Sequence, residues 1–247
     1  MRRLAILALA STILALPVST AAQEADQPTR VYVSYYQVNY GDLLEWMDLY
    51  RQDWEPLLAE MVADGRLLGY NALIHNTGGI YNFRLAMQGT RDTNFDRVGE
   101  DVLAQWTTRN PASFQRTLEM LRGHDDELWN IDQARLTQGA EWQFMYDNSI
   151  QVPFEHWPTF TDTWNDALED VLEQARSDGI LSGWVVETHN TGGRFNWKVL
   201  LLFPTWDDIS DLQGRLFEAV PLDHPLWSYL DAHKDEIWEQ MPPAGGE

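Results

Sequence analysis

The chain contains no cysteine among its 247 residues. This absence excludes disulfides, thiol nucleophiles, iron–sulfur clusters and zinc sites built from cysteine. Basic side chains are scarce as well, since 17 lysines and arginines stand against 38 aspartates and glutamates. The resulting formal net charge of −21 repels phosphate backbones and anionic lipid headgroups. We therefore expect no nucleic-acid partner, and we interpret the acidic surface as one that keeps the protein soluble.

The familiar signatures of cofactor and nucleophile chemistry are also missing. The sequence has no Gly-rich phosphate loop, no GxSxG elbow, no HExxH pair and no dinucleotide fingerprint. The acidic runs "DDE" and "WDD" are typical of the first turn of a helix, where carboxylates complement the helix dipole. The sequence therefore identifies no metal site and leaves any cofactor unknown.

Long apolar runs are missing everywhere except at the N-terminus. There, two arginines precede an apolar run from Leu4 to about Leu16, and small residues follow, which is the order of a secretory signal peptide. The run is shorter than the ~20 residues that span a bilayer, which argues against an uncleaved anchor. We predict that residues 1–22 are a signal peptide cleaved after Ala22. The mature protein is then periplasmic or secreted and has no membrane partner.

The strongest positive feature is an internal repeat. The segment "DGRLLGYNALIHNTGGIYNFRL" (64–85) aligns with "DGILSGWVVETHNTGGRFNWKV" (178–199) at an offset of 114 residues, and ten of these 22 positions are identical. Agreement of this length indicates a duplication within the chain. We predict a first repeat over residues 28–136 and a second over residues 137–242.

The order of elements is the same in both repeats. Strand-like runs at 30–38 and 141–147 precede stretches with apolar residues at helical spacing, and each of these ends at Asp-Gly. Two apolar runs joined through HNTGG follow and predict a hairpin, in which Thr-Gly-Gly forms the turn. Acid-rich helix starts come next, at 91–106 and 205–220.

A short block closes each repeat: "HDDELW" (124–129) recurs as "HKDEIW" (233–238). The block is either more helix or a fourth strand, and the sequence leaves both alternatives open. If it is helical, a histidine and an acid three residues apart could share a metal ion. The interpretation we prefer is structural, with His124 and His233 capping or flanking a helix.

With a fourth strand, each repeat has the order strand–helix–strand–strand–helix–strand of a ferredoxin-like domain. The chain resembles the dimeric α+β barrel superfamily in a tandem, single-chain form, and within it the NIPSNAP-like and EthD-like domains. The resemblance implies an α+β fold in which two ferredoxin-like repeats pack their antiparallel sheets into one pseudo-twofold barrel, with the helices outside. One chain then closes the barrel, so we expect a monomer, with a homodimer as the alternative.

Two pairs of polar residues are kept in both repeats. We predict His75 and His189, from HNTGG, as catalytic candidates that would act as general acids or bases. The alternative, which we prefer, is that they form hydrogen bonds to the turn backbone. Asn82 and Asn196 lie three residues beyond the turn in aromatic strands, and they are either ligand-binding or bonded to a neighbouring strand.

Aromatic residues are abundant, with 12 tryptophans in the chain. Those near the first strands of the repeats could line a pocket for a flat apolar ligand, although aromatic stripes more often form core. Our ligand-binding candidates among them are Tyr36, Tyr146 and Trp197.

These observations favour an exported protein that binds a small apolar or aromatic molecule in an accessory role. The resemblance adds a second hypothesis, because superfamily members include cofactor-independent monooxygenases and isomerases and haem-dependent enzymes. In that case His75 and His189 would be the acid–base groups, or one of them a haem ligand. A third hypothesis is a scaffold without a ligand.

Overall fold

The computed structural model describes residues 27–242. The predicted signal peptide, residues 1–22, lies outside the described residues. Within them, no helix has both the length and the apolar character needed to cross a membrane.

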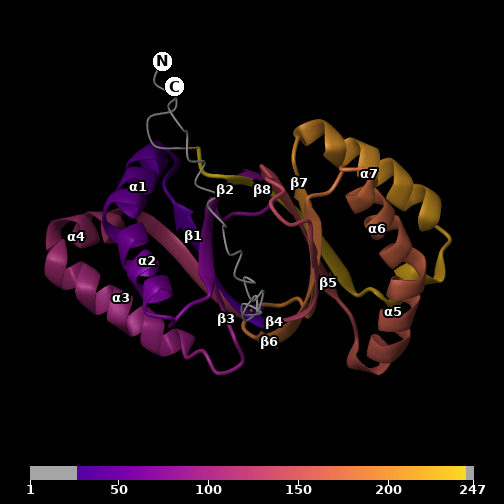
Figure 1. Cartoon of the computed structure of the whole chain (residues 1–247), viewed down its shortest axis with the longest axis horizontal. Helices are drawn as coiled ribbons and strands as arrows, with labels where there is room; N and C mark the ends of the chain where they lie inside the picture. Colours follow the sequence, from indigo (N-terminus) through magenta and orange to yellow (C-terminus); the bar gives the residue numbers. More distant parts are fainter. Residues whose placement is uncertain (1–26, 243–247) are drawn as a thin grey trace, which may run out of the picture.

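Eight antiparallel strands form a closed barrel in the order β1-β3-β2-β8-β5-β7-β6-β4, with β4 pairing back to β1 (Figure 1). Each repeat supplies four neighbouring strands, and the halves meet at two seams, β2–β8 and β4–β6. The strands are β1 (Arg30–Val38), β2 (Gly69–Thr77), β3 (Phe83–Gly89), β4 (Leu121–Leu136), β5 (Phe144–Gln151), β6 (Gly183–Thr191), β7 (Trp197–Phe203) and β8 (Ala232–Gln240).

The helices lie outside the barrel, those of the first repeat on one flank and those of the second on the other (Figure 1). They are α1 (Leu43–Leu49), α2 (Glu55–Ala63), α3 (Phe95–Arg109), α4 (Pro111–Met120), α5 (Trp157–Trp164), α6 (Asp170–Ser177) and α7 (Trp206–Ala219). Short π-helical turns, η2 (Tyr50–Trp54) and η4 (Asn165–Glu169), join α1 to α2 and α5 to α6. The remaining short elements are the 3-10 turns η1 (Tyr40–Asp42), η3 (Phe154–His156) and η5 (Pro225–Tyr229). The predicted α+β barrel with outer helices is therefore confirmed.

Strand alternation divides the core into three parts. On β1, Val31 and Val33 face the barrel lumen, whereas Tyr32 and Tyr36 face the helices of the first repeat. Apolar side chains from both repeats, including Trp129 and Trp238, pack in the lumen, and each half of the barrel has its own apolar layer against its helices. Closure of the barrel buries the inner face of the sheet, and the helices cover the outer face.

The closing block of each repeat is a strand and not a helix. "HDDELW" lies in β4 and "HKDEIW" lies in β8, which corrects the interpretation of this block as helix and of "DDE" as a helix start. The block has the period of two that a strand requires, since Leu128 packs outward whereas Trp129 fills the lumen. Six residues are too few to distinguish this period from helical spacing. The other acidic run is as predicted: "WDD" opens α7 with a capping box between Thr205 and Asp208.

The predicted HNTGG hairpins are confirmed, joining β2 to β3 and β6 to β7. Gly78, Gly192 and Gly193 have φ angles of 121°, 86° and 68°, which L-residues rarely adopt. Each turn also packs against the closing block of the other repeat. The backbone N–H of Gly79 donates to the Glu236 carboxylate at 3.0 Å, and a Cβ atom on Gly193 would collide with the carboxylate of Glu127.

Candidate functional site

A cavity of about 250 Å³ lies between the outer face of the second repeat's sheet and its helices. Its walls are mainly apolar side chains of β5, β7, α5, α6, α7 and η5. Representative lining residues are Ile150, Phe160, Trp164, Leu168, Leu201, Leu212 and Leu226. Polar groups gather in one part of the lining: Tyr146 and Asn148 of β5, Gln213 of α7, and His233 and Asp235 of β8.

The corresponding space in the first repeat is filled by large aromatic side chains. The offset of 114 residues places Tyr36 opposite Ile150 and Trp54 opposite Leu168. Tyr36 meets Trp54 edge to face with ring centroids 5.5 Å apart, and Trp54 stacks on Trp106 at 5.1 Å. The second repeat replaces the first two of these rings by aliphatic side chains, and the smaller volume leaves the cavity.

The first repeat also has a helix, α4, that has no counterpart in the second repeat and helps to fill the corresponding space. In the first repeat, α4 follows α3 and places Phe114 against Trp106 at 5.4 Å. In the second repeat, only the 3-10 turn η5 stands between α7 and the last strand.

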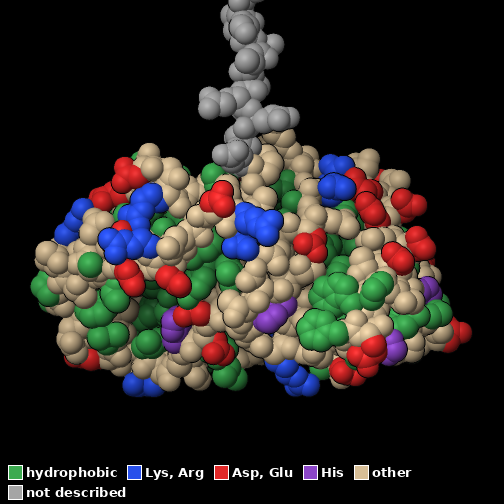
Figure 2. Space-filling model, turned by 90° about the horizontal axis from the view of Figure 1, so that it is seen from below, with side chains coloured by type: hydrophobic (Ala, Val, Ile, Leu, Met, Phe, Trp, Pro, Cys, Tyr) green, Lys and Arg blue, Asp and Glu red, His purple; other side chains and the backbone are tan. Residues whose placement is uncertain are grey.

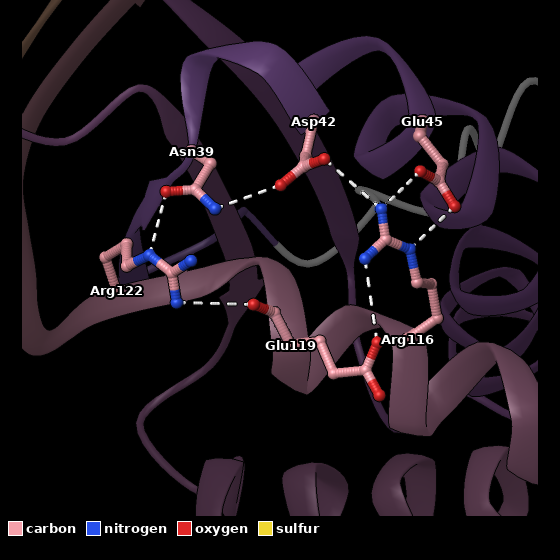
Figure 3. A network of polar contacts seen from close by, with 6 residues as sticks. All are labelled: Asn39, Asp42, Glu45, Arg116, Glu119 and Arg122. Atoms are coloured by element: carbon pink, nitrogen blue, oxygen red, sulfur yellow. Dashed lines mark hydrogen bonds and ion pairs between the residues drawn. The ribbon is translucent and has the colours of Figure 1, made fainter.

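Polar contacts hold α4 against the start of the first helix (Figure 3). Arg116 of α4 binds Glu45 through two nitrogens at 2.9 and 2.7 Å and lies 3.2 Å from Asp42. Beside it, Arg122 donates to Asn39 at 2.8 Å. These bonds keep the first repeat closed by a full helix.

The polar part of the cavity is a connected cluster centred on Asp235. The Nε2 atom of His233 lies 3.0 Å from Asp235 Oδ2, and Asn148 donates to Asp235 Oδ1 at 2.6 Å. The bond to Asp235 raises the pKa of His233 above its usual value. Burial alone would raise the pKa of Asp235, but its bonds to His233, Asn148 and Tyr146 outweigh burial and lower it. Each partner therefore stabilises the charged form of the other.

The first repeat carries the same kind of cluster, with an aromatic ring stacked on its histidine. His124 lies 3.0 Å from Asp126, and Ser34, in the place of Asn148, donates to Asp126 at 2.6 Å. The ring of Tyr36 stacks on the His124 imidazole with centroids 4.7 Å apart and planes at 21°. Ile150 cannot cover His233 in this way, so the histidine of the second repeat faces the cavity.

The predicted catalytic histidines lie elsewhere, one beside each seam. His75 contacts Trp238 edge to face at 5.3 Å, and burial lowers its pKa. His189 contacts Trp129 at 5.8 Å, and its Nε2 bonds to the carbonyl of Gly192 in its own turn. Neither lines the cavity. A catalytic role for this pair stays a prediction, whereas the packing on the partner repeat's tryptophan is a structural role that both share.

The two asparagines are bonded to the backbone of a neighbouring strand. Asn82 is 1% exposed; its Oδ1 accepts from Val38 N at 2.8 Å and its Nδ2 donates to Val38 O at 2.6 Å. Asn196 makes the same pair of bonds to Val152, at 2.9 and 2.7 Å. Both amides are thus engaged within the protein, and a ligand contact by either stays a prediction.

The aromatic candidates are divided between the two repeats. Tyr146 lines the cavity, and Tyr36 belongs to the cluster that fills the first repeat. Trp197 is 2% exposed and packs edge to face on Phe160, a lining residue, at 5.1 Å. Asn148 and Gln213 were not among the residues predicted from the sequence. Assigning the closing block to a strand would have placed His233 and Asp235 on one face.

A second polar cluster occupies the barrel lumen and was also missed. The Lys198 ammonium lies 3.2 Å from Glu127, 3.5 Å from Asp147 and 2.9 Å from the Tyr35 hydroxyl. Burial disfavours its charge, but the surrounding acidic groups raise its pKa well above the usual value. Lys198 is therefore an ammonium ion and no nucleophile. Burial raises the pKa of Glu187, in the same cluster, to about 7.

No protein-family model matches the sequence, and no curated protein matches it either. Solved structures do match the fold. A candidate monooxygenase from Fusobacterium nucleatum has a TM-score of 0.55 and 12% identity, over 87% of this chain and 93% of that one. A protein named as a candidate chlorite dismutase has a TM-score of 0.57 and 8% identity, over 87% and 96% of the two chains.

A haem-binding protein from Thermus thermophilus is also similar, with a TM-score of 0.50 and 9% identity over 87% of this chain and 92% of that one. Identities this low establish the fold alone. Together with the closed eight-stranded barrel, they confirm the predicted resemblance: the chain has the dimeric α+β barrel fold, with both halves supplied by one polypeptide.

Proposed function

We propose that the protein binds a small, mainly apolar or aromatic molecule in the cavity of the second repeat. The observation that carries the proposal is the cavity itself, about 250 Å³ of space with apolar walls and polar groups in one part. Ligand sites in proteins combine these features, at volumes of roughly 300–1,000 Å³. The cavity lies just below that range, so we expect a compact ligand with one or two rings and one polar group.

The comparison between the repeats favours binding over a scaffold role. A scaffold needs both sheets covered and packed, as the first repeat is by Tyr36, Trp54 and α4. Away from the cavity the second repeat also has larger side chains in places, such as Trp197 opposite Phe83, and protein interiors are generally close-packed. A space left at one place in such a core supports a ligand site.

A haem does not fit this cavity. The histidine among the lining residues is His233, which is already paired with the carboxylate of Asp235. Among the described residues that line the cavity, none is a lysine or arginine that could pair with haem carboxylates, and Asp235 would repel them. The likeness to haem proteins therefore remains one of fold.

The binding proposal is tested by filling the cavity with the first repeat's own residues. The double variant Ile150→Tyr/Leu168→Trp copies Tyr36 and Trp54. The probe is N-phenyl-1-naphthylamine, an uncharged aromatic dye that fluoresces in apolar sites. We expect saturable binding to the wild-type protein and at least tenfold weaker binding to the double variant.

The control is Leu103→Trp, which adds a tryptophan at an exposed position of α3. It should bind the dye like the wild-type protein. Equal binding by the filled variant and the control would place the dye elsewhere and refute the proposal. Native mass spectrometry of protein purified from its own source would then identify any ligand that accompanies it.

We further propose that binding takes place outside the cytoplasm, in the periplasm or after secretion. The charged start, short apolar run and small residues of positions 1–22 support this. N-terminal sequencing of the mature protein should begin at Gln23, and retention of Met1 would contradict it.

A further inference from the structure

The two repeats place the same pair of side chains on the outer face of their sheets, and the pair of the second repeat lines the cavity. In the first repeat, the ring of Tyr36 stacks on His124, which pairs with Asp126 of β4. In the second repeat, Ile150 stands at the position of Tyr36, and His233 and Asp235 of β8 face the cavity. The side chains of His124 and His233 are similarly exposed, at 39% and 43%, so the second pair is distinguished by its place in the wall of an apolar cavity, and this place suggests chemistry.

We propose that His233 is a catalytic acid–base residue that moves a proton at an acidic C–H bond of the molecule held in the cavity. This rests on the binding function proposed above. The substrate class is a small apolar or aromatic compound in which a neighbouring carbonyl group acidifies the C–H bond. Asp235 is a positioning residue, because it acts through His233.

The geometry assigns a different task to each nitrogen of the imidazole. Nε2 lies 3.0 Å from the carboxylate of Asp235, and a charge-assisted bond of this kind keeps the proton on Nε2. The amide nitrogen of Asn148 lies 2.8 Å from Nε2 and donates its hydrogen bond to the same carboxylate. Nδ1 then carries the lone pair, and within residues 27–242 no hydrogen bond engages it. An aspartate that orients a histidine in this way is a common arrangement for proton transfer.

The proposed step is balanced without a further reactant. The Nδ1 lone pair takes the proton, and the C–H electron pair moves toward the carbonyl, whose oxygen becomes an enolate. The imidazolium is stabilised by Asp235. Return of the proton from Nδ1 to a neighbouring carbon of the same conjugated system restores the neutral imidazole and yields an isomer. No electrons enter or leave the substrate.

The pH dependence follows from the groups that face His233. These are Asp235 on the same strand, Tyr146 and Asn148 on β5, and Gln213 on α7, and among them Asp235 carries the charge. The bond to Asp235 raises the pKa of His233. Base catalysis needs the neutral imidazole, so the rate should rise with pH and level off above a midpoint higher than that of an ordinary histidine.

The test uses 5-nitrobenzisoxazole, a compact aromatic probe of base catalysis. A base removes its single ring C–H proton next to nitrogen, the N–O bond breaks, and a coloured nitrophenolate forms. We expect the wild-type protein to accelerate this reaction and His233→Asn to lower the rate by about 10²-fold, the lower end of what a general base contributes. The matched control is His124→Asn, which removes the equivalent histidine outside the cavity and should leave the rate unchanged.

A second variant keeps the test decisive if His233→Asn does not fold. Asp235→Asn removes the charge that raises the pKa of His233, so the midpoint of the pH–rate profile should move to lower pH. A role in folding alone would leave that midpoint in place. Equal rates for His233→Asn and wild type, or no acceleration by the wild-type protein, would overturn the proposal.

The same samples separate this proposal from the binding function. If the dye binds the wild-type protein and is excluded by Ile150→Tyr/Leu168→Trp, but His233→Asn changes no rate, binding stands and catalysis fails. If the double variant still binds the dye, the cavity is not the site, and both proposals fail together.

Discussion

The Lys198 cluster in the barrel lumen offers the clearest prediction about stability. Lys198 is 1% exposed and lies within 3.5 Å of Glu127 and Asp147. Replacing it by methionine keeps most of the side-chain volume but leaves two buried acids without their cation. Removing one partner of a buried ion pair costs about 3–5 kcal/mol of unfolding free energy. For a protein of this size, that lowers the melting temperature by roughly 2–4 °C for each kcal/mol.

The measurement is urea unfolding followed by tryptophan fluorescence, at fixed pH and salt. Arg109→Met is the control, because Arg109 pairs with Glu60 at 2.7 Å and the two side chains are 50% and 46% exposed. Exposed ion pairs contribute about 1 kcal/mol or less. If Lys198→Met costs no more than Arg109→Met, the lumen cluster does not have the role that its geometry indicates.

Two further predictions concern buried polar groups. Burial raises the pKa of Glu187 from 4.5 to about 7, so between these pH values the folded state binds more protons than the unfolded state. The free energy of unfolding therefore falls as pH rises. Urea unfolding at pH 5 and pH 8 should show this loss in the wild-type protein and a smaller loss in Glu187→Gln, and an equal loss in both would contradict the prediction. Asn196→Ala removes both hydrogen bonds to the backbone of Val152. It should lower the free energy of unfolding by about 2–4 kcal/mol, because each buried polar group left unpaired costs roughly 1–3 kcal/mol. Asn190→Ala, at an exposed position, should lower it far less in the same assay, and comparable losses would argue against a structural role for Asn196.

The fold could be predicted from the sequence because the duplication presents each local sequence pattern twice. The Asp-Gly helix ends and the HNTGG turns each occur twice, so a coincidence in one repeat is checked by the other. The closing strands were ambiguous for a physical reason. A six-residue block with a histidine, acids and a tryptophan satisfies helical and strand spacing equally, and only pairing with β1 and β5 resolves it.

The site was harder to predict, because identity between the repeats draws attention to the wrong residues. His75, Asn82 and their equivalents are kept in both halves because both halves need the same turn and seam contacts. The cavity arises where the halves differ, at Tyr36 against Ile150 and Trp54 against Leu168. The volume of the cavity depends on the sum of small differences in side-chain size and on the absence of a counterpart to α4. No single sequence motif indicates either of these.

Exposed hydrophobic side chains also bear on the candidate ligand site. Seen from below, hydrophobic side chains appear on both flanks of the molecule among acidic ones (Figure 2). On the second repeat, Phe217 and Trp227 line the cavity and are also 61% and 38% exposed. Aromatic side chains that reach both the cavity and the solvent mark the route by which an apolar ligand would enter.

Each glycine turn packs against the opposite repeat, and this packing separates the parts of the protein that hold the barrel together from the parts that can be redesigned. Gly79 and Gly193 meet the carboxylates of Glu236 and Glu127, and all four residues lie at the junctions between halves, away from the outer helices. Barrel closure and ligand capacity therefore depend on separate sets of residues. A designer could reshape one helical layer for a new guest molecule while the junctions preserve the assembly.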